Sequence, residues 1–243
     1  MNNELRLALL ISGGGTTAEA IIRACSMGKL TGITPVLVIA SREGIAGIER
    51  VIKAGMEEKN VIILNPKNFE SSLAFGDAIV RACLERDVNI IGQYGWLCKT
   101  PANVIVEFEG RMINQHPGPL DPGFQDFGGT GMYGKRVHAA RLCFVKKTNK
   151  DFWTEATSQK VAIEYDGGAI LNKKQVPILP DDTPETLANR ILPVEHEVQI
   201  ETLENFARGE SKEIVREERL VRPGEEKILD ECKTEAIKNY PKG

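Results

Sequence analysis

Residues 5–27, LRLALLISGGGTTAEAIIRACSM, contain the stretch that decides the fold. Leu5–Ile11 is a mostly apolar run without alternation, which predicts a strand buried on both faces. Ser12–Thr17 is a glycine loop, and Ala18–Met27 has its apolar residues at helical spacing. A strand, a glycine loop and a helix in this order predict the opening unit of a parallel α/β sheet.

The same alternation continues through the first half of the chain, where Pro35–Ala40 (PVLVIA) is again apolar throughout. We therefore predict an α/β fold: a Rossmann-like, mostly parallel sheet with helices on both faces. The predicted strands are Leu5–Ile11, Pro35–Ala40, Val61–Leu64, Val88–Ile91 and Arg111–Ile113, and the helices between them are Ala18–Met27, Ile45–Ala54 and Phe69–Arg86.

The pattern changes after Pro101, and residues 117–131 form a loop dense in proline and glycine. The elements predicted beyond it are a helix over Lys135–Lys147, strands over Lys160–Tyr165 and Ala169–Val176 joined at Asp166-Gly167-Gly168, a helix from Thr183-Pro184 to about Arg208, and an amphipathic helix over Glu225–Tyr240. We divide the chain into a main domain of residues 1–208, with halves 1–101 and 102–208, and a charged C-terminal extension of residues 209–243.

Composition narrows the classes of function. Hydrophobic residues make up 42% of the chain, enough for a core, and the net charge of −3 offers no basic surface to nucleic acid. The five cysteines are widely spaced and include no CxxC pair, so we expect free buried thiols, no disulfide and no zinc site. The apolar N-terminal run is too short for a membrane span and lacks a signal-peptide cleavage pattern, so we expect a soluble cytoplasmic protein.

The glycine loop predicts a phosphate site, because its N–H groups and the positive end of the following helix both attract anions. The loop has no lysine, which argues against a P-loop nucleotide site. Arg42 follows the second predicted strand, where it could bind the extra phosphate of NADP, so an NADP-dependent reductase stays open as an alternative. A tight strand-to-helix turn without a ligand is the other alternative, although three glycines before two hydroxyls exceed what such a turn needs.

The stretch MINQHPGPL, residues 112–120, ends a predicted strand with Asn114 and His116. Residues two apart on a strand point the same way, so both side chains face one side. An amide donor beside an imidazole suits acyl transfer, and a nearby carboxylate would keep the imidazole charged by raising its pKa. Asp166, at its own strand end, is the candidate, although Asp-Gly is also an ordinary hairpin turn. No Ser or Cys lies in a nucleophile elbow and no metal-ligand cluster occurs, which favours direct transfer without a covalent intermediate.

Four segments together resemble the folate-dependent formyltransferases, and most closely the members that formylate phosphoribosylglycinamide. The similarity covers roughly Leu5 to Arg208. The segments are LLISGGGTTAEAII, MINQHPGPL, KVAIEYDGGAILNKKQVPI and DDTPETLANRILPVEH. Each is weakly specific, but all four occur in the family's order and at compatible spacing.

The resemblance implies a reaction in which the amine of 5′-phosphoribosylglycinamide attacks the formyl carbon of 10-formyltetrahydrofolate, a co-substrate, during de novo purine synthesis. It implies no metal and small-molecule partners, with neither nucleic acid nor membrane, and the charged tail is a candidate homodimer contact. The site residues it implies are Asn114, His116 and Asp166 for catalysis, Gly15, Thr16 and Thr17 for the phosphate, Glu195 for the ribose, and Gly95, Trp96, Leu97, Cys98 and Lys99 for folate.

Several features depart from the family pattern. Thr17 stands where the family usually has Asn, and Gln159 stands where it commonly has a His. The segment GQYGWLCKTP is more similar to the methionyl-tRNA formyltransferases, and the loop of residues 121–134 is unusually long and rich in glycine. Transfer to methionyl-tRNA or to a nucleotide-linked amino sugar therefore stays open, as does a non-catalytic protein that binds folate or a ribose phosphate.

Overall fold

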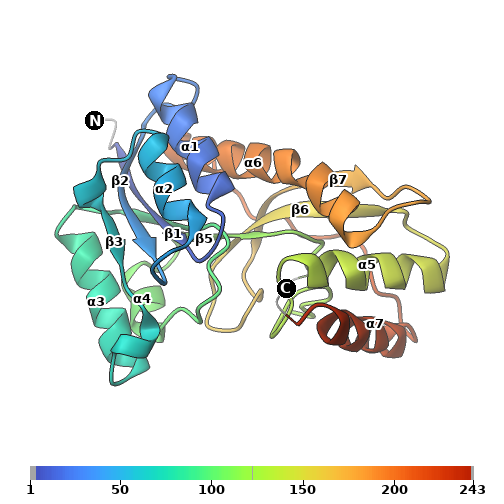
Figure 1. The fold of residues 1–243 in the computed structure, drawn as a ribbon. Coiled ribbons are helices and arrows are strands. Elements are labelled where there is room, and N and C mark those ends of the chain that lie inside the picture. The colour runs from blue at the N-terminus through green and yellow to red at the C-terminus, as the bar shows by residue number, and fades with distance from the viewer. Residues whose placement is uncertain (1–3, 122, 242–243) are drawn as a thin grey trace. The chain divides into compact units, whose positions relative to one another are not determined.

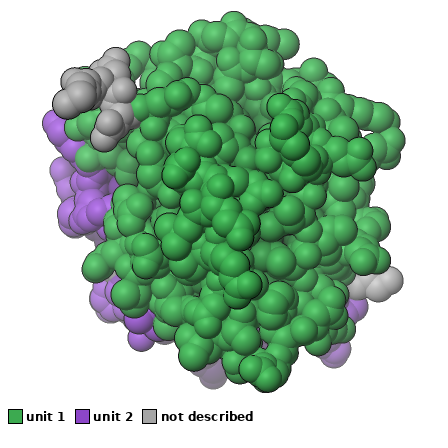
Figure 2. Space-filling model, turned by 90° about the vertical axis from the view of Figure 1, so that its left-hand side faces the viewer, with its two compact units in different colours: residues 1–115, 199–211 green, residues 116–198, 212–243 purple. Residues whose placement is uncertain are grey.

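The computed structural model describes residues 4–121 and 123–241 and divides into two compact units. Unit 1 contains residues 1–115 and 199–211, and unit 2 contains residues 116–198 and 212–243. Figure 2 shows unit 1 in green and unit 2 in purple. Each unit is described by itself below.

Unit 1 is built on parallel strands whose order is β3-β2-β1-β4-β5. Their central residues are buried on both faces, as the unbroken apolar runs predict. The strands are β1 (Leu5–Ile11), β2 (Ile33–Ala40), β3 (Val61–Ile63), β4 (Ile90–Gln93) and β5 (Met112–His116). The predicted parallel α/β fold is confirmed (Figure 1).

The strand order also explains how the helices cover the sheet. The connections from β1 to β3 progress one way across the sheet, whereas those that lead to β4 and β5 progress the other way. Because such crossovers are right-handed, the two groups of helices lie on opposite faces. The helices are α1 (Thr16–Ser26) and α2 (Ala46–Lys53) on one face, and α3 (Ser72–Leu84) and α4 (Ala102–Glu107) on the other. The sequence analysis did not predict α4, which has only six residues.

Unit 2 contains an antiparallel pair of strands and most of the later helices. Its elements are α5 (Lys135–Thr148), β6 (Trp153–Lys160), β7 (Ile170–Pro177), the first part of α6 (Pro184–Arg208) and α7 (Glu226–Asn239). The helix α6 begins as predicted, with the Thr183 hydroxyl accepting from the Thr186 N–H at 3.2 Å. No helix among the described residues is both long and apolar enough to cross a membrane.

One predicted strand of unit 2 is wrong. The sequence analysis placed it at Lys160–Tyr165, whereas β6 is Trp153–Lys160 and residues 161–169 turn toward β7. The polar sequence WTEATSQK hides this strand, although six of its eight residues are buried. Glu155 can be fully buried there because Arg216 pairs with its carboxylate.

The expectation that all cysteines are free is also wrong. Cys143 on α5 and Cys232 on α7 form a disulfide, which closes a sequence separation of 89 residues. The two helices lie side by side (Figure 1) and share a core whose members include Phe127, Phe144 and Leu229. A cysteine count alone could not identify this pair, because only the fold brings α7 against α5.

Candidate active site

The glycine loop of unit 1 has a shape that only glycine allows. Gly15 has φ +67°, and a Cβ on it would lie 2.8 Å from the Cα of Gly47 on α2. The Gly47 N–H donates to the Gly13 carbonyl at 3.0 Å, which fixes the loop against α2. The loop is therefore a close-packed turn that delivers the chain into the first turn of α1.

A pocket of about 130 Å³ opens at this turn. A water molecule occupies roughly 30 Å³ in the liquid, so the pocket has room for a phosphate group. All its lining residues belong to unit 1; they are Gly13, Gly14, Gly15, Thr16, Thr17, Tyr94, Gly95 and Gln115. The predicted phosphate-binding residues thus line a single pocket, at the N-terminus of a helix that attracts anions.

Two lining residues were not predicted from the sequence. The Tyr94 hydroxyl and the Gln115 Oε1 are buried and have no hydrogen-bond partner within the described part of the chain. Burial also raises the pKa of the Tyr94 hydroxyl, so it stays a neutral donor. Buried polar atoms without partners are costly, which indicates that a polar ligand or water completes them. The alternation of β5 could have identified Gln115, which points away from Asn114 and His116.

The predicted folate segment, residues 95–99, begins at the pocket and then diverges. The Ser12 N–H donates to the Gly95 carbonyl at 3.1 Å, and the Leu97 N–H donates to the Ser12 hydroxyl at 3.0 Å. Trp96 is buried and stacks on Phe75 with ring centroids 6.3 Å apart, so it fills the core of unit 1. Exposed Leu97 and Lys99 and half-buried Cys98 remain accessible to a ligand.

In unit 2 the structure brings His116 and Asp166 together. His116 Nδ1 lies 3.7 Å from Asp166 Oδ2, and both side chains are nearly buried, with 3% and 9% exposed. The Gln159 amide donates to Asp166 Oδ1 at 2.6 Å, and the Gly129 N–H donates to Asp166 Oδ2 at 2.9 Å. Gln159, the departure from the family pattern, therefore orients the carboxylate without carrying a titratable proton.

The expected charge on His116 is not supported. The pKa of His116 is lowered, because burial outweighs the opposite effect of the Asp166 carboxylate. A hydrogen bond to the backbone of Phe127 opposes the lowering as well, while Lys233 adds to it. Asp166 acts on the pKa of His116 in the predicted direction, but burial, which is the larger effect, favours the neutral imidazole.

The hydrogen-bond partners of His116 favour one tautomer of the neutral ring. His116 Nε2 has no hydrogen-bond partner within the described part of the chain, so the nitrogen that bonds to the Phe127 backbone is Nδ1. Neutral imidazole then carries its proton on Nδ1 and presents Nε2 as a bare acceptor. A Cβ on Gly118 would lie 3.5 Å from Nε2, so glycine leaves the space next to this nitrogen free of a side chain at position 118.

Asn114 lies two residues before His116 on β5, as predicted. Its partner in the sheet is Gln93 on β4, so it sits at the carboxyl end of that pair of strands. In open α/β sheets ligands bind beyond these strand ends, which agrees with a binding role for Asn114.

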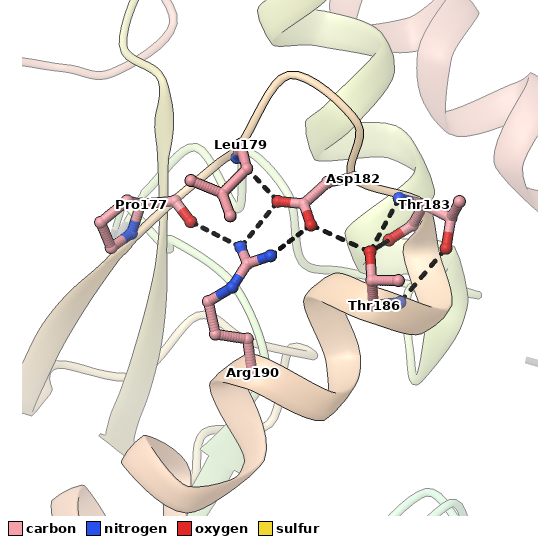
Figure 3. Close-up of polar contacts among 6 residues, drawn as sticks. All are labelled: Pro177, Leu179, Asp182, Thr183, Thr186 and Arg190. Carbon is pink, nitrogen blue, oxygen red and sulfur yellow. Dashed lines mark hydrogen bonds and ion pairs between the residues drawn. The ribbon is translucent and has the colours of Figure 1, made fainter.

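The last predicted residue, Glu195, is buried on α6 in unit 2. The start of this helix is anchored by Asp182 and Arg190, whose side chains pair directly (Figure 3). Arg190 also donates to the Pro177 carbonyl at 2.9 Å, and its hydrogen bond to Asp182 lowers the pKa of that carboxyl to about 2. The anchored helix fixes the position of Glu195, whose ribose-binding role stays a prediction.

Comparison with known proteins defines the class. The sequence pattern of the formyl transferase family matches residues 5–203, so the chain belongs to this family. Among individual relatives, phosphoribosylglycinamide formyltransferase of Dictyostelium discoideum is 30% identical over 209 residues, covering 81% of this chain and 95% of that protein. The chloroplastic proteins of the same name from Arabidopsis thaliana and Vigna unguiculata are 30% and 32% identical and each align with 82% of this chain.

The chain spans 64% and 60% of the lengths of these two plant relatives. Solved structures agree with the assignment. Glycinamide ribonucleotide transformylase 1 from Symbiobacterium toebii has a TM-score of 0.73 and 27% identity, covering 86% of this chain and 90% of its own. Phosphoribosylglycinamide formyltransferase from Brucella melitensis has a TM-score of 0.71 and 29% identity, covering 87% and 100%.

Proposed function

We propose that this chain transfers the formyl group of 10-formyltetrahydrofolate to the amino group of 5′-phosphoribosylglycinamide in de novo purine synthesis, in the cytoplasm. The observation that carries the proposal is the buried His116–Asp166 pair, which ends a strand that also presents Asn114, in a chain of the formyl transferase family. The names of the relatives support the choice of acceptor.

The glycine pocket would bind the phosphate of the acceptor. Backbone N–H groups of Gly15, Thr16 and Thr17 supply donors that do not depend on pH, and α1 adds the positive end of its dipole. Glu195 would accept hydrogen bonds from the ribose, and residues 95–99 would bind folate.

Transfer begins when the acceptor nitrogen attacks the formyl carbon, which places negative charge on the formyl oxygen. The Asn114 amide donates to that oxygen. His116 Nε2, unprotonated in the resting state, accepts the proton that the attacking amine loses. The imidazolium formed in this way also donates to the oxygen, and the neighbouring Asp166 carboxylate stabilises its charge.

The intermediate collapses when the bond between the formyl carbon and N10 of the folate breaks. The leaving nitrogen takes up one proton, which balances the one that the acceptor lost. Each turnover forms one C–N bond and breaks another without oxidation or reduction, so the residues on hand suffice for the chemistry.

The test is a competition among acceptors. Purified protein is mixed with 10-formyltetrahydrofolate and either phosphoribosylglycinamide, a nucleotide-linked amino sugar or methionyl-tRNA, and formylated products are measured by mass spectrometry. We expect only phosphoribosylglycinamide to react efficiently, and its unphosphorylated riboside to react poorly. Preferential formylation of the amino sugar or of the tRNA would overturn the assigned acceptor. Binding of folate without formylation of any acceptor would favour the non-catalytic alternative, and the family match disfavours the NADP reductase.

A further inference from the structure

The family match ends at residue 203, yet the chain continues into a segment that packs firmly within unit 2. Ile214 pairs with Ile170, the first residue of β7, and α7 packs along α5. The buried residues that this segment contributes to the shared core are Leu220, Val221, Leu229, Cys232 and Ala236. Residues 212–241 are therefore part of the folded unit and not a solvated tail.

One side chain of this segment reaches the loop beside the His116–Asp166 pair. The Lys233 ammonium on α7 donates to the carbonyls of Asp126 and Gly128 at 3.0 and 2.9 Å. Those two residues flank Phe127, whose backbone bonds to His116. The next residue, Gly129, gives its N–H to Asp166. Lys233 thus holds the stretch that contacts both members of the pair.

Two arginines of the same segment hold neighbouring parts of this loop. Arg219 pairs with the Asp126 carboxylate at 3.2 Å and lies over the Phe124 ring, 3.8 Å from its centroid. Arg216 donates to the Leu120 carbonyl at 2.6 Å and pairs with buried Glu155. Three cations from one segment therefore converge on residues around the loop.

The loop requires such support because its backbone is unfavourable by itself. Gln125 and Asp126 have φ 61° and 29°, in a region that residues other than glycine rarely adopt. A Cβ on Gly128 would lie 2.7 Å from the Asp166 Cβ, so glycine is needed for this close approach. Glycine and left-handed residues persist in one conformation only where the surroundings impose it.

We propose that residues 212–241 act as a clamp on residues 123–129, and that Lys233 is the positioning residue that sets the geometry and the charge balance of the His116–Asp166 pair. The inference rests on the proposed function, since the pair is taken to be catalytic. It goes beyond the family, because the segment lies outside the residues that the family pattern matches.

Electrostatics give the clamp a measurable signature. The ionisable groups that face His116 are Asp166, Lys233 and His138. Lys233 lowers the pKa of His116, and Asp166 opposes it. Burial lowers the pKa of His138 to about 4, so His138 is neutral over the working range of pH. Removing the Lys233 charge should therefore raise the pKa of His116, and the acid limb of kcat/KM should move to higher pH.

The test compares Lys233→Met with Lys227→Met, which removes an exposed lysine from the same helix. We expect Lys233→Met to lower kcat about 10- to 100-fold, as small misplacements of catalytic groups do, with little change in KM for phosphoribosylglycinamide. Histidine NMR follows the titration directly, since the chain has only three histidines. The His116 pKa should rise in Lys233→Met and stay at the wild-type value in Lys227→Met.

Wild-type kcat together with an unshifted His116 titration in Lys233→Met overturns the clamp. If that variant does not fold, Arg219→Gln replaces it, because Arg219 is partly exposed and its loss removes the contacts with Asp126, the Phe124 ring and Glu226 while leaving Lys233 in place. A smaller fall in kcat is then expected, and full activity overturns the clamp. Should the wild-type protein fail to formylate any acceptor, the proposed function fails, while the NMR titration still decides whether Lys233 acts on His116.

Discussion

The glycine pocket of unit 1 and the His116–Asp166 pair of unit 2 are built in opposite ways. The pocket consists largely of backbone from five consecutive residues, 13–17, fitted against Gly47. The pair consists of buried side chains, held by a loop that depends on Lys233 from α7. A site made of backbone is encoded locally, whereas a site made of side chains depends on contacts between distant segments.

The two sites also differ in their response to pH. Backbone N–H groups do not titrate, so the affinity of the pocket for its anion should depend on pH only through the charge of the ligand. The pair depends on a balance in which burial and Lys233 lower the pKa of His116 and Asp166 raises it. Changes to the His116–Asp166 pair should therefore alter kcat and its pH profile, and changes to the glycine pocket should alter KM.

The largest expected effect comes from removing the pair. His116→Ala and Asp166→Asn should fold normally but lose about 10²- to 10⁴-fold in kcat, because positioned acid–base groups contribute that much to rate. Steady-state formylation of phosphoribosylglycinamide measures the loss. Asp181→Asn, at an exposed carboxylate, is the matched control and should keep wild-type activity. Activity above about a tenth of wild type in either test variant would remove the pair from the chemistry.

The second-largest expected effect comes from removing the disulfide that joins α7 to α5. In the chain-entropy account, a bond that closes 89 residues stabilises the protein by up to about 4.6 kcal/mol. The double variant Cys143→Ala/Cys232→Ala should be less stable by up to that amount in urea unfolding, and its kcat should fall toward that of Lys233→Met. Cys25→Ala, at a free thiol, should change neither.

Thiol titration gives an independent reading of the same bond. The unfolded, unreduced protein should present three thiols and the reduced protein five. Five thiols before reduction would show that the bond is absent in the purified protein. The result also bears on the cytoplasmic expectation, because reducing compartments keep most thiols free.

These contrasts explain how far the sequence could predict the structure. The parallel sheet of unit 1 could be predicted from the unbroken apolar strands and the glycine loop, because each of these signals lies within a short stretch of sequence. The strand β6 was misplaced because a buried Glu155 makes it look solvent-exposed, and its partner Arg216 lies 61 residues away. The contacts of Lys233 and the Cys143–Cys232 bond could not be predicted from the neighbouring sequence, because they form only when α7 packs within unit 2.

The predicted site shows the same division. The pairing of His116 with Asp166 was predicted by assuming that both lie at strand ends. The contact is observed, although Asp166 lies in the turn between β6 and β7. The predicted charge on His116 did not allow for burial, because burial is a property of the surrounding packing and no pattern in the sequence reports it. Tyr94 and Gln115 were missed, since neither belongs to a motif with a defined chemistry.

A smaller effect should follow from disturbing the pocket. Gly15→Ala places a Cβ against Gly47 and forces a residue with φ +67° away from its preferred region, at a cost of roughly 1–2 kcal/mol. We expect KM for phosphoribosylglycinamide to rise about tenfold, with kcat at saturation and the His116 titration nearly unchanged. Gly28→Ala has a similar φ of +69° but open space around it, so it isolates backbone strain from the contact with Gly47. An equal rise in KM for Gly28→Ala would contradict the pocket assignment.

The smallest expected effect comes from replacing Gln159, which stands where the family commonly has a His. Its neutral amide donates to Asp166 at every pH, so the wild-type acid limb should reflect His116 without a second histidine. In Gln159→His the new imidazole can become protonated below its ordinary pKa of about 6.5, and the Asp166 carboxylate opposes the lowering that burial causes. A protonated imidazole at position 159 would compete with protonated His116 for stabilisation by the Asp166 carboxylate. The acid limb of kcat/KM should then steepen, whereas the rate near pH 8 should change less than about tenfold. An unchanged slope would mean that the group at this position orients Asp166 without influencing the charge of His116.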